Sequence, residues 1–98
     1  MKLKGKVAII TGSSRGIGFG IAEGFVKEGA SVVICGSTLE SAQKGVDNIK
    51  SKFKDADVFP LALNISDTTS IKEGFKQVVE HYGKLDVLVN NAVNNERS

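Results

Sequence analysis

The chain has 98 residues, of which 41% are hydrophobic and 24% charged, and its net charge is +2. This length and composition predict one soluble globular domain. Because basic side chains are interspersed with acidic ones, we expect no surface for nucleic acid and none for a membrane. The single cysteine, Cys35, has no partner for a disulfide and fits a structural thiol in a reducing compartment. With no apolar stretch of membrane-spanning length and no targeting segment, the protein is expected to be cytoplasmic.

Apolar residues follow two alternating periodicities along the chain. Short runs rich in β-branched residues predict strands at residues 7–10, 31–35, 58–63 and 85–89. Between them, apolar residues at helical spacing predict helices whose apolar stripes run from Ile17 to Val26, from Leu39 to Phe53 and from Ile71 to Tyr82. The expected order is therefore βαβαβαβ.

A glycine-rich turn, Thr11 to Gly18, joins the first strand to the first helix. Glycine lets the backbone approach a ligand closely, and the start of a helix offers unpaired N–H groups and the positive end of a dipole. The turn therefore predicts a site for a nucleotide phosphate. It lacks the lysine followed by serine or threonine of a Walker loop, and Ile21 stands where the GxGxxG spacing has its third small residue.

The segment after the second strand, Gly36-Ser37-Thr38, contains no carboxylate, and the first one appears at Glu40. An acidic side chain at this place would accept hydrogen bonds from the adenosine ribose and repel a 2′-phosphate. Arg15 in the glycine turn can instead bind a phosphate with a bidentate fork, although a solvated surface cation is the alternative. A bound dinucleotide is therefore predicted to be NADP, with NAD less favoured.

Breaker and capping residues mark the ends of the later elements. Pro60 would remove a backbone donor from the third strand, which favours an edge position for that strand. Ser66 with Asp67 can cap the start of the third helix, and Gly29 and Gly83 stand where helices end in a left-handed conformation.

Strands that alternate with helices through short turns predict right-handed crossovers and a parallel sheet. We expect an α/β fold, a truncated Rossmann-type doubly wound sheet with strand order 3-2-1-4. The first two helices would cover one face and the third helix the other. A ligand is expected between the loops after Ile10 and Val89, where the winding direction reverses. Residues 1–92 would form a dinucleotide-binding half-domain, and residues 93–98 a polar tail.

Two motifs in this pattern resemble those of the short-chain dehydrogenase/reductase family. They are TGxxxGxG at residues 11–18 and Asn90-Asn91-Ala92 after the fourth strand. The resemblance covers the chain up to Ala92. Within the family it is closest to 3-oxoacyl-acyl-carrier-protein reductases, which are similar in residues 5–8, 14–18 and 64–67.

The resemblance implies roles for individual residues in binding the cofactor. Asn64 and Ile65 would contact adenine, and Asn91 with Ala92 would approach the ribose next to nicotinamide. The full expected set of cofactor-binding residues is Gly12, Ser13, Ser14, Arg15, Ile17, Gly18, Ser37, Thr38, Asn64, Ile65, Asn91 and Ala92. Structural alternatives remain open, because Asn64 can cap a turn, Ile65 can belong to the core and Asn90 can bridge backbone groups.

The catalytic residues that this family uses are missing from the sequence. Its members use a tyrosine as proton donor, a lysine four residues later that lowers the pKa of that tyrosine, and a serine that polarises the substrate. The one tyrosine here is Tyr82, and four residues later stands Asp86. Tyr82 is predicted to pack on the apolar helical stripe and His81 to lie on the surface. We therefore expect no catalytic residue and no metal ligand.

The expected function is that of the NADP-binding N-terminal portion of a reductase that transfers hydride between NADPH and a ketone or secondary alcohol, such as a 3-oxoacyl thioester. One alternative is a dinucleotide-binding module without turnover, and another is a remnant that only pairs with a partner. An unpaired fourth strand would favour self-association through its edge. The family has glycine where Val93 stands, and the chain is expected to be a fragment, an incomplete reading or a truncated product.

Overall fold

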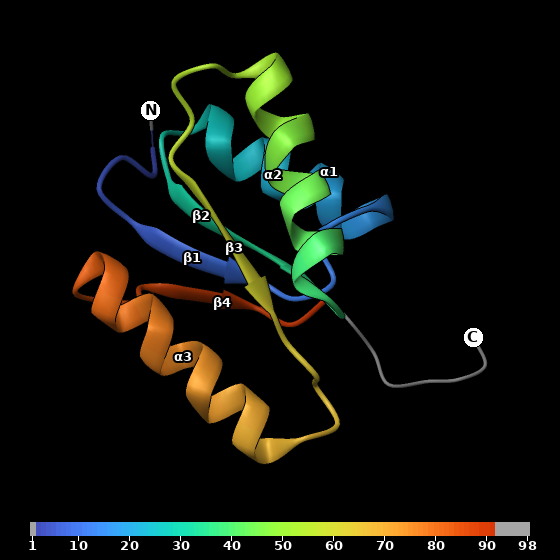
Figure 1. The fold of residues 1–98 in the computed structure, drawn as a ribbon. Helices are drawn as coiled ribbons and strands as arrows, with labels where there is room; N and C mark the ends of the chain where they lie inside the picture. The colour runs from blue at the N-terminus through green and yellow to red at the C-terminus, as the bar shows by residue number, and fades with distance from the viewer. Residues whose placement is uncertain (1, 92–98) are drawn as a thin grey trace.

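The computed structural model describes residues 2–91 (Figure 1). The strands are β1 (Val7–Ile10), β2 (Ser31–Gly36), β3 (Val58–Ala62) and β4 (Val87–Val89). The helices between them are α1 (Gly16–Lys27), α2 (Leu39–Lys52) and α3 (Thr68–Tyr82). This order confirms the predicted βαβαβαβ alternation. β3 ends one residue before the predicted Leu63, and β4 begins two residues after the predicted Leu85.

All pairings within the sheet are parallel, and the strand order is β3-β2-β1-β4. Ile9 of β1 lies opposite Val33 of β2 on one side and Leu88 of β4 on the other. The chain therefore reverses its winding direction at β1, as the doubly wound order predicted. β3, which contains Pro60, lies at one edge of the sheet.

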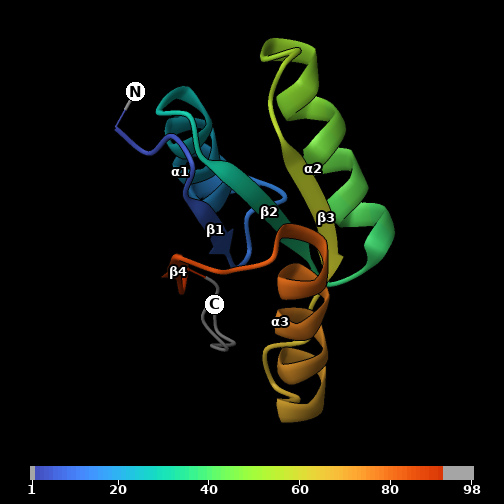
Figure 2. The same ribbon diagram turned by 90° about the vertical axis from the view of Figure 1, so that its left-hand side faces the viewer.

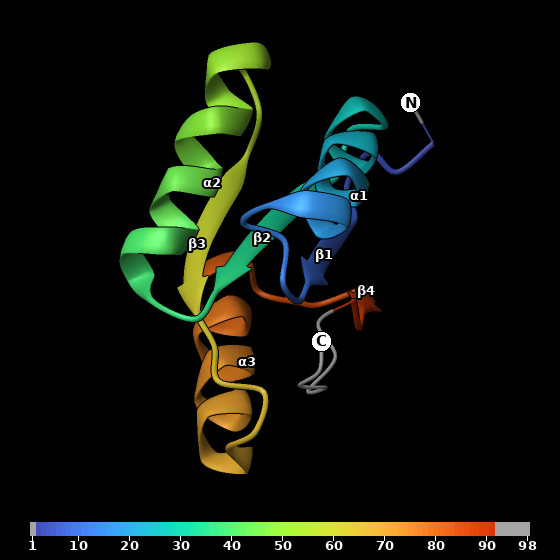
Figure 3. The ribbon, with the colours of Figure 1, turned by 90° about the vertical axis from the view of Figure 1, so that its right-hand side faces the viewer.

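Helices cover both faces of the sheet. Figures 1, 2 and 3 show α1 and α2 on one side and α3 on the other. The core beneath α1 and α2 consists of Ile10, Ala22, Val26, Ala30, Val32, Ile34, Val46, Ile49 and Val58. The core beneath α3 consists of Val7, Ile9, Val33, Cys35, Leu61, Leu63 and Val78. Successive strand residues alternate between the two cores because side chains of a strand point to opposite faces.

The helix ends follow local chemistry. The Asp67 side chain accepts hydrogen bonds from the N–H groups of Thr69 and Ser70 and so caps α3, whereas the predicted contribution of Ser66 is absent from the cap. Gly83 ends α3 at a φ of 83°, in the left-handed region that favours glycine. The capping signals of the sequence therefore located the ends of α3 to within a residue.

Three apolar residues of the predicted helical stripes are exposed rather than packed in the core. Ile17 is 80% exposed, Leu39 is 58% exposed and Val79 is 46% exposed. Ile17 and Leu39 lie in the first turn of their helices, whereas the buried residues begin at Gly18 in α1 and at Ala42 in α2. Within residues 2–91, no helix has the length and apolarity needed to span a membrane.

Candidate functional site

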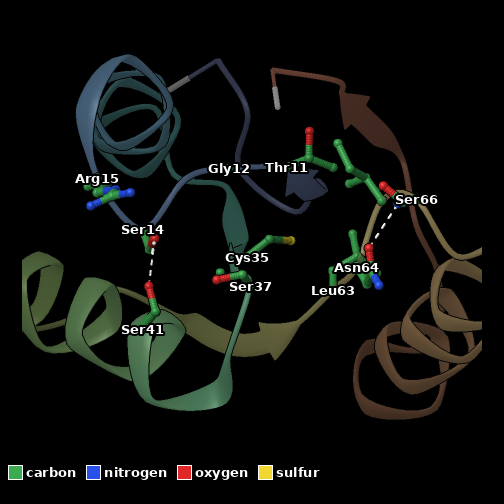
Figure 4. A pocket seen from close by; sticks show the side chains of 12 residues that line it. Thr11, Gly12, Ser14, Arg15, Cys35, Ser37, Ser41, Leu63, Asn64 and Ser66 are labelled. Atoms are coloured by element: carbon green, nitrogen blue, oxygen red, sulfur yellow. Dashed lines mark hydrogen bonds between the residues drawn. The ribbon is translucent and has the colours of Figure 1, made fainter. Parts of the chain in front are cut away.

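A pocket of about 550 Å³ lies at the carboxyl ends of β1, β2 and β3 (Figure 4). The residues that line it are Thr11, Gly12, Ser14, Arg15, Cys35, Gly36, Ser37, Ser41, Leu63, Asn64, Ile65 and Ser66. The loop after Ile10 contributes to it, as predicted. The loop after Val89 does not, as far as the described residues extend, so the pocket extends toward β3 rather than β4. This edge of a doubly wound sheet is where ligands of such folds bind.

The glycine turn presents its backbone to the pocket. Gly12 and Gly16 have φ values of 62° and 67°, which side-chain-bearing residues rarely adopt. Arg15 is the N-cap residue of α1, and its guanidinium, which has no acceptor atom, does not cap the helix N–H groups. α2 and α3 do have side-chain caps. The first N–H groups of α1 therefore have no side-chain cap and lie at the positive end of the helix dipole, where an anion is stabilised.

Ser13 anchors the glycine turn to β2. Its side chain is fully buried, and its Oγ accepts a hydrogen bond from the Cys35 N–H at 2.9 Å. The backbone N–H groups of Ser13 and Ser14 donate to the Cys35 carbonyl at 3.1 and 3.2 Å. The structure thus places Ser13, a predicted cofactor ligand, behind the pocket rather than in its lining.

Gly18 and Asn91 hold the turn against α1 and the end of β4. A Cβ atom at Gly18 would lie 2.3 Å from the Gly12 carbonyl oxygen and 2.7 Å from Asn91 Nδ2. The Asn91 N–H donates to Thr11 Oγ1 at 2.9 Å, and the Thr11 hydroxyl donates to Asn90 Oδ1 at 3.3 Å. The contact of Asn90 joins two side chains, so its bridging of backbone groups stays a prediction. Gly18 and Asn91 support the turn from outside the pocket lining.

The charge at the mouth of the pocket is positive. Arg15 is exposed and lines the pocket together with Ser37. Thr38 lies outside the lining, because its Oγ1 accepts a hydrogen bond from the Ser41 N–H and caps α2. Glu40 is exposed in the first turn of α2 and also lies outside the lining. No Asp or Glu among the described residues lines this pocket.

Asn64 and Ile65 close the pocket on the β3 side. Asn64 Oδ1 accepts a hydrogen bond from the Ser66 N–H at 3.0 Å, which is the turn-capping role that the sequence left open. Ile65 packs against the core beneath α3 while it lines the pocket. Each residue therefore combines its structural role with a place in the lining.

The pocket gathers only some of the predicted cofactor-binding residues. It brings together Gly12, Ser14, Arg15, Ser37, Asn64 and Ile65. It does not include Ser13, Ile17, Gly18, Thr38 and Asn91 in its lining. Ala92, and with it Val93, lies outside the described residues.

The sequence prediction missed several residues that line the pocket, which are Thr11, Cys35, Gly36, Ser41, Leu63 and Ser66. Thr11, Cys35 and Leu63 end or directly follow the predicted strands, and this position was the available signal. Burial raises the pKa of the Cys35 thiol to about 12, so the thiol stays protonated and fits the predicted structural role. Ser41 had no sequence signal, since only the packing of α2 brings it to the pocket.

Tyr82 lies at the opposite end of the sheet from the pocket. Its hydroxyl donates to Asp57 Oδ1 at 3.0 Å, and Asp57, just before β3, also accepts from Ser31 at the start of β2. Burial, followed by the negative charge of Asp57, raises the pKa of Tyr82. Tyr82 packs against the core beneath α3 and His81 is exposed, as predicted for both. His81 also stacks on Phe59.

Comparison with known proteins decides the family. A family model described as short chain dehydrogenase matches residues 6–97. The chain belongs to the short chain dehydrogenase family. These oxidoreductases bind nicotinamide dinucleotides, and the predicted resemblance is confirmed. In the part of the chain that the structure describes, no three His, Cys, Asp or Glu side chains form a group that could hold a metal ion.

Curated short chain dehydrogenases match nearly the whole chain. A 3alpha-hydroxysteroid dehydrogenase of Mediterraneibacter gnavus is 39% identical over 94% of this chain and 37% of its own length. A 3-oxoacyl-acyl-carrier-protein reductase of Thermotoga maritima is 42% identical over 94% of this chain and 37% of its own. The 15-hydroxyprostaglandin dehydrogenase of Bos taurus, whose name specifies NAD(+), is 37% identical over 100% of this chain and 37% of its own.

A solved structure of a hydroxysteroid dehydrogenase has the same fold. A hydroxysteroid dehydrogenase from Escherichia coli superimposes with a TM-score of 0.87 at 35% identity, over 95% of this chain and 39% of the other. The chain thus spans little more than a third of the length of the short chain dehydrogenases that it matches.

Proposed function

We propose that this chain binds NADP(H) in the pocket and forms the cofactor-binding part of a short chain dehydrogenase that transfers hydride between NADPH and a ketone or secondary alcohol, such as a 3-oxoacyl thioester. One observation carries the choice of cofactor. Arg15 lines the pocket, and within residues 2–91 no carboxylate side chain lines it. A 2′-phosphate would therefore meet a cation and no repelling charge.

The lining residues fit a dinucleotide of this kind. The start of α1 and the glycine turn would hold the pyrophosphate, Arg15 and Ser37 the 2′-phosphate, and Asn64 with Ile65 the adenine. When bound, the nicotinamide supplies or accepts the hydride. Relatives include an enzyme named for NAD(+) and a 3-oxoacyl reductase, so similarity alone leaves the cofactor open and the charge of the pocket supports NADP.

The experiment is a titration of the chain with NADPH and with NADH, followed by cofactor fluorescence. Arg15→Ala should raise the Kd of NADPH about tenfold and leave that of NADH within about twofold, because a charge-assisted hydrogen bond contributes about 1.5–3 kcal/mol. Lys50→Ala removes an exposed cation from α2 and serves as the control. Equal affinity for the two cofactors, unchanged by Arg15→Ala, would refute the choice of NADP.

The place of Tyr82 favours a second function, which is dinucleotide binding without turnover by residues 1–98 on their own. Tyr82 is bonded to Asp57 at the amino edge of the sheet, away from the pocket at the carboxyl edge, and cannot donate a proton to a substrate there. An absorbance assay with NADPH and a 3-oxoacyl thioester tests this second function. Binding of NADPH with unchanged absorbance supports it, and consumption of NADPH by residues 1–98 would refute it.

A further inference from the structure

Ser41 joins the wall of the pocket through one hydrogen bond. Its Oγ donates to Ser14 Oγ at 3.1 Å, and Figure 4 shows the two side chains pointing toward one another. Both side chains are half-buried and line the pocket. They lie 27 residues apart in the sequence, on the glycine turn and on the first turn of α2.

Two glycines allow α2 to come close enough for this contact. A Cβ atom at Gly36 would lie 3.0 Å from Ser41 Oγ, and one at Gly45 would lie 3.0 Å from Ser14 Cα. The Ser41 N–H donates to Thr38 Oγ1 at 3.1 Å, which fixes the backbone of Ser41 at the helix start. The pair of hydroxyls is therefore held by packing on both sides.

A serine hydroxyl donates one hydrogen bond and can accept others. When the Ser14 hydroxyl donates its proton to a phosphate oxygen, the Ser41 hydroxyl can donate to Ser14 Oγ across the 3.1 Å contact. The Ser14 hydroxyl then has an occupied acceptor site and its own proton left to donate, and the bond it accepts strengthens it as a donor. Phosphate oxygens only accept hydrogen bonds, so they match a hydroxyl that is left to donate. Arg15, which follows Ser14 in the pocket lining, adds a positive charge beside it.

We propose that Ser41 is a positioning residue that sets the preference for NADP over NAD, because its hydrogen bond directs the Ser14 hydroxyl toward the 2′-phosphate. This inference rests on the proposed function. It adds a residue on α2 that the sequence pattern did not single out, and it predicts that Ser14 and Ser41 act as one unit.

The test measures the Kd of NADPH and of NADH by cofactor fluorescence for the wild-type chain, Ser41→Ala, Ser14→Ala and the double variant. Ser41→Ala should raise the Kd of NADPH about fivefold and leave that of NADH within about twofold, as expected for loss of one hydrogen bond to a charged group. The double variant should bind NADPH no more weakly than Ser14→Ala. Ser14→Ala already removes the hydrogen bond between Ser14 and Ser41, so the loss of Ser41 has no further effect. Ser41→Thr keeps the hydroxyl and should restore binding.

Ser51→Ala is the matched control, because Ser51 lies on the same helix, is exposed and donates to the Asn48 carbonyl far from the pocket. Three results would overturn the inference alone: an unchanged Kd of NADPH in Ser41→Ala, equal losses for both cofactors, or additive losses in the double variant. A wild-type chain that binds neither dinucleotide would overturn the proposed function, and the inference with it.

Discussion

Gly18 and Gly20 show how differently one residue type acts two positions apart on α1. A Cβ atom at Gly18 would lie 2.3 Å from the Gly12 carbonyl oxygen, whereas one at Gly20 would meet nothing within 4 Å. Gly18 therefore permits a close approach between the helix and the glycine turn. Gly20 only adds flexibility to the unfolded chain and lowers helix propensity.

Alanine substitutions at the two positions should have opposite effects on stability. Gly18→Ala should lower the free energy of unfolding by about 1–3 kcal/mol, because the turn must move away from the new methyl group. Gly20→Ala should raise it by about 0.5–1 kcal/mol. Urea denaturation followed by circular dichroism measures both. A stability of Gly18→Ala equal to that of Gly20→Ala would contradict the close approach.

Ser13 and Ser14 mark the limit of what the sequence predicts about the site. Both belong to the glycine turn, and both were expected to bind the cofactor. Ser13 is fully buried, and its Oγ accepts a hydrogen bond from the Cys35 N–H. Ser14 instead lines the pocket, where its Oγ contacts Ser41 Oγ. Two adjacent serines carry no local signal that separates these roles. The difference comes from β2 and α2, which the fold places on either side of the turn.

Strand β4 is short and is held to β1 by side chains at both ends. At its start, Asp86 Oδ2 accepts a hydrogen bond from the Val7 N–H at 2.8 Å, and Lys84 Nζ lies 3.1 Å from the same oxygen. At its end, the Thr11 hydroxyl accepts from the Asn91 N–H. The hydrogen bond from Val7, followed by the contact with Lys84, lowers the pKa of Asp86.

The lowered pKa of Asp86 predicts a dependence of stability on pH. A carboxyl whose pKa falls on folding stabilises the protein fully above its ordinary pKa of about 4, and this contribution is lost as the pH falls toward the lowered value. Asp86→Asn keeps an acceptor for Val7 but does not titrate. Its urea midpoint should therefore fall less than that of the wild type between about pH 5 and about pH 3.

The control for this measurement is Asp55→Asn, in the exposed loop before β3. Its urea midpoint should follow the pH dependence of the wild type. If Asp86→Asn shows the same fall as the wild type, the contact with Val7 does not act through the charge of Asp86.

The sheet as a whole is covered unevenly. Leu88 of β4 is 50% exposed, although its neighbour Ile9 on β1 is fully buried on the same face of the sheet. Within residues 2–91, β4 pairs with β1 alone and forms an edge of the sheet. A parallel sheet is normally covered on both faces, and an exposed apolar edge strand is a template for pairing with another chain.

We propose that two copies of the 98-residue chain associate through β4. Sedimentation velocity at increasing concentration should show a dimer or larger species, and Leu88→Lys should shift the distribution toward the monomer, because a charge at an edge strand opposes pairing. Leu39→Lys, at a residue 58% exposed on α2, is the control. A wild-type chain that stays monomeric at all concentrations would refute this proposal.

The sequence by itself determined the elements, the parallel sheet and the position of the glycine turn, because these depend on signals between residues close together in the chain. Such signals include the alternating periodicities, the capping residue Asp67 and the glycines of the turn. Only the tertiary structure decided that Ser13 is buried and that Ser41 reaches the pocket. These outcomes depend on contacts between segments more than 20 residues apart, whose geometry is set by the packing of α2 and the turn on β2.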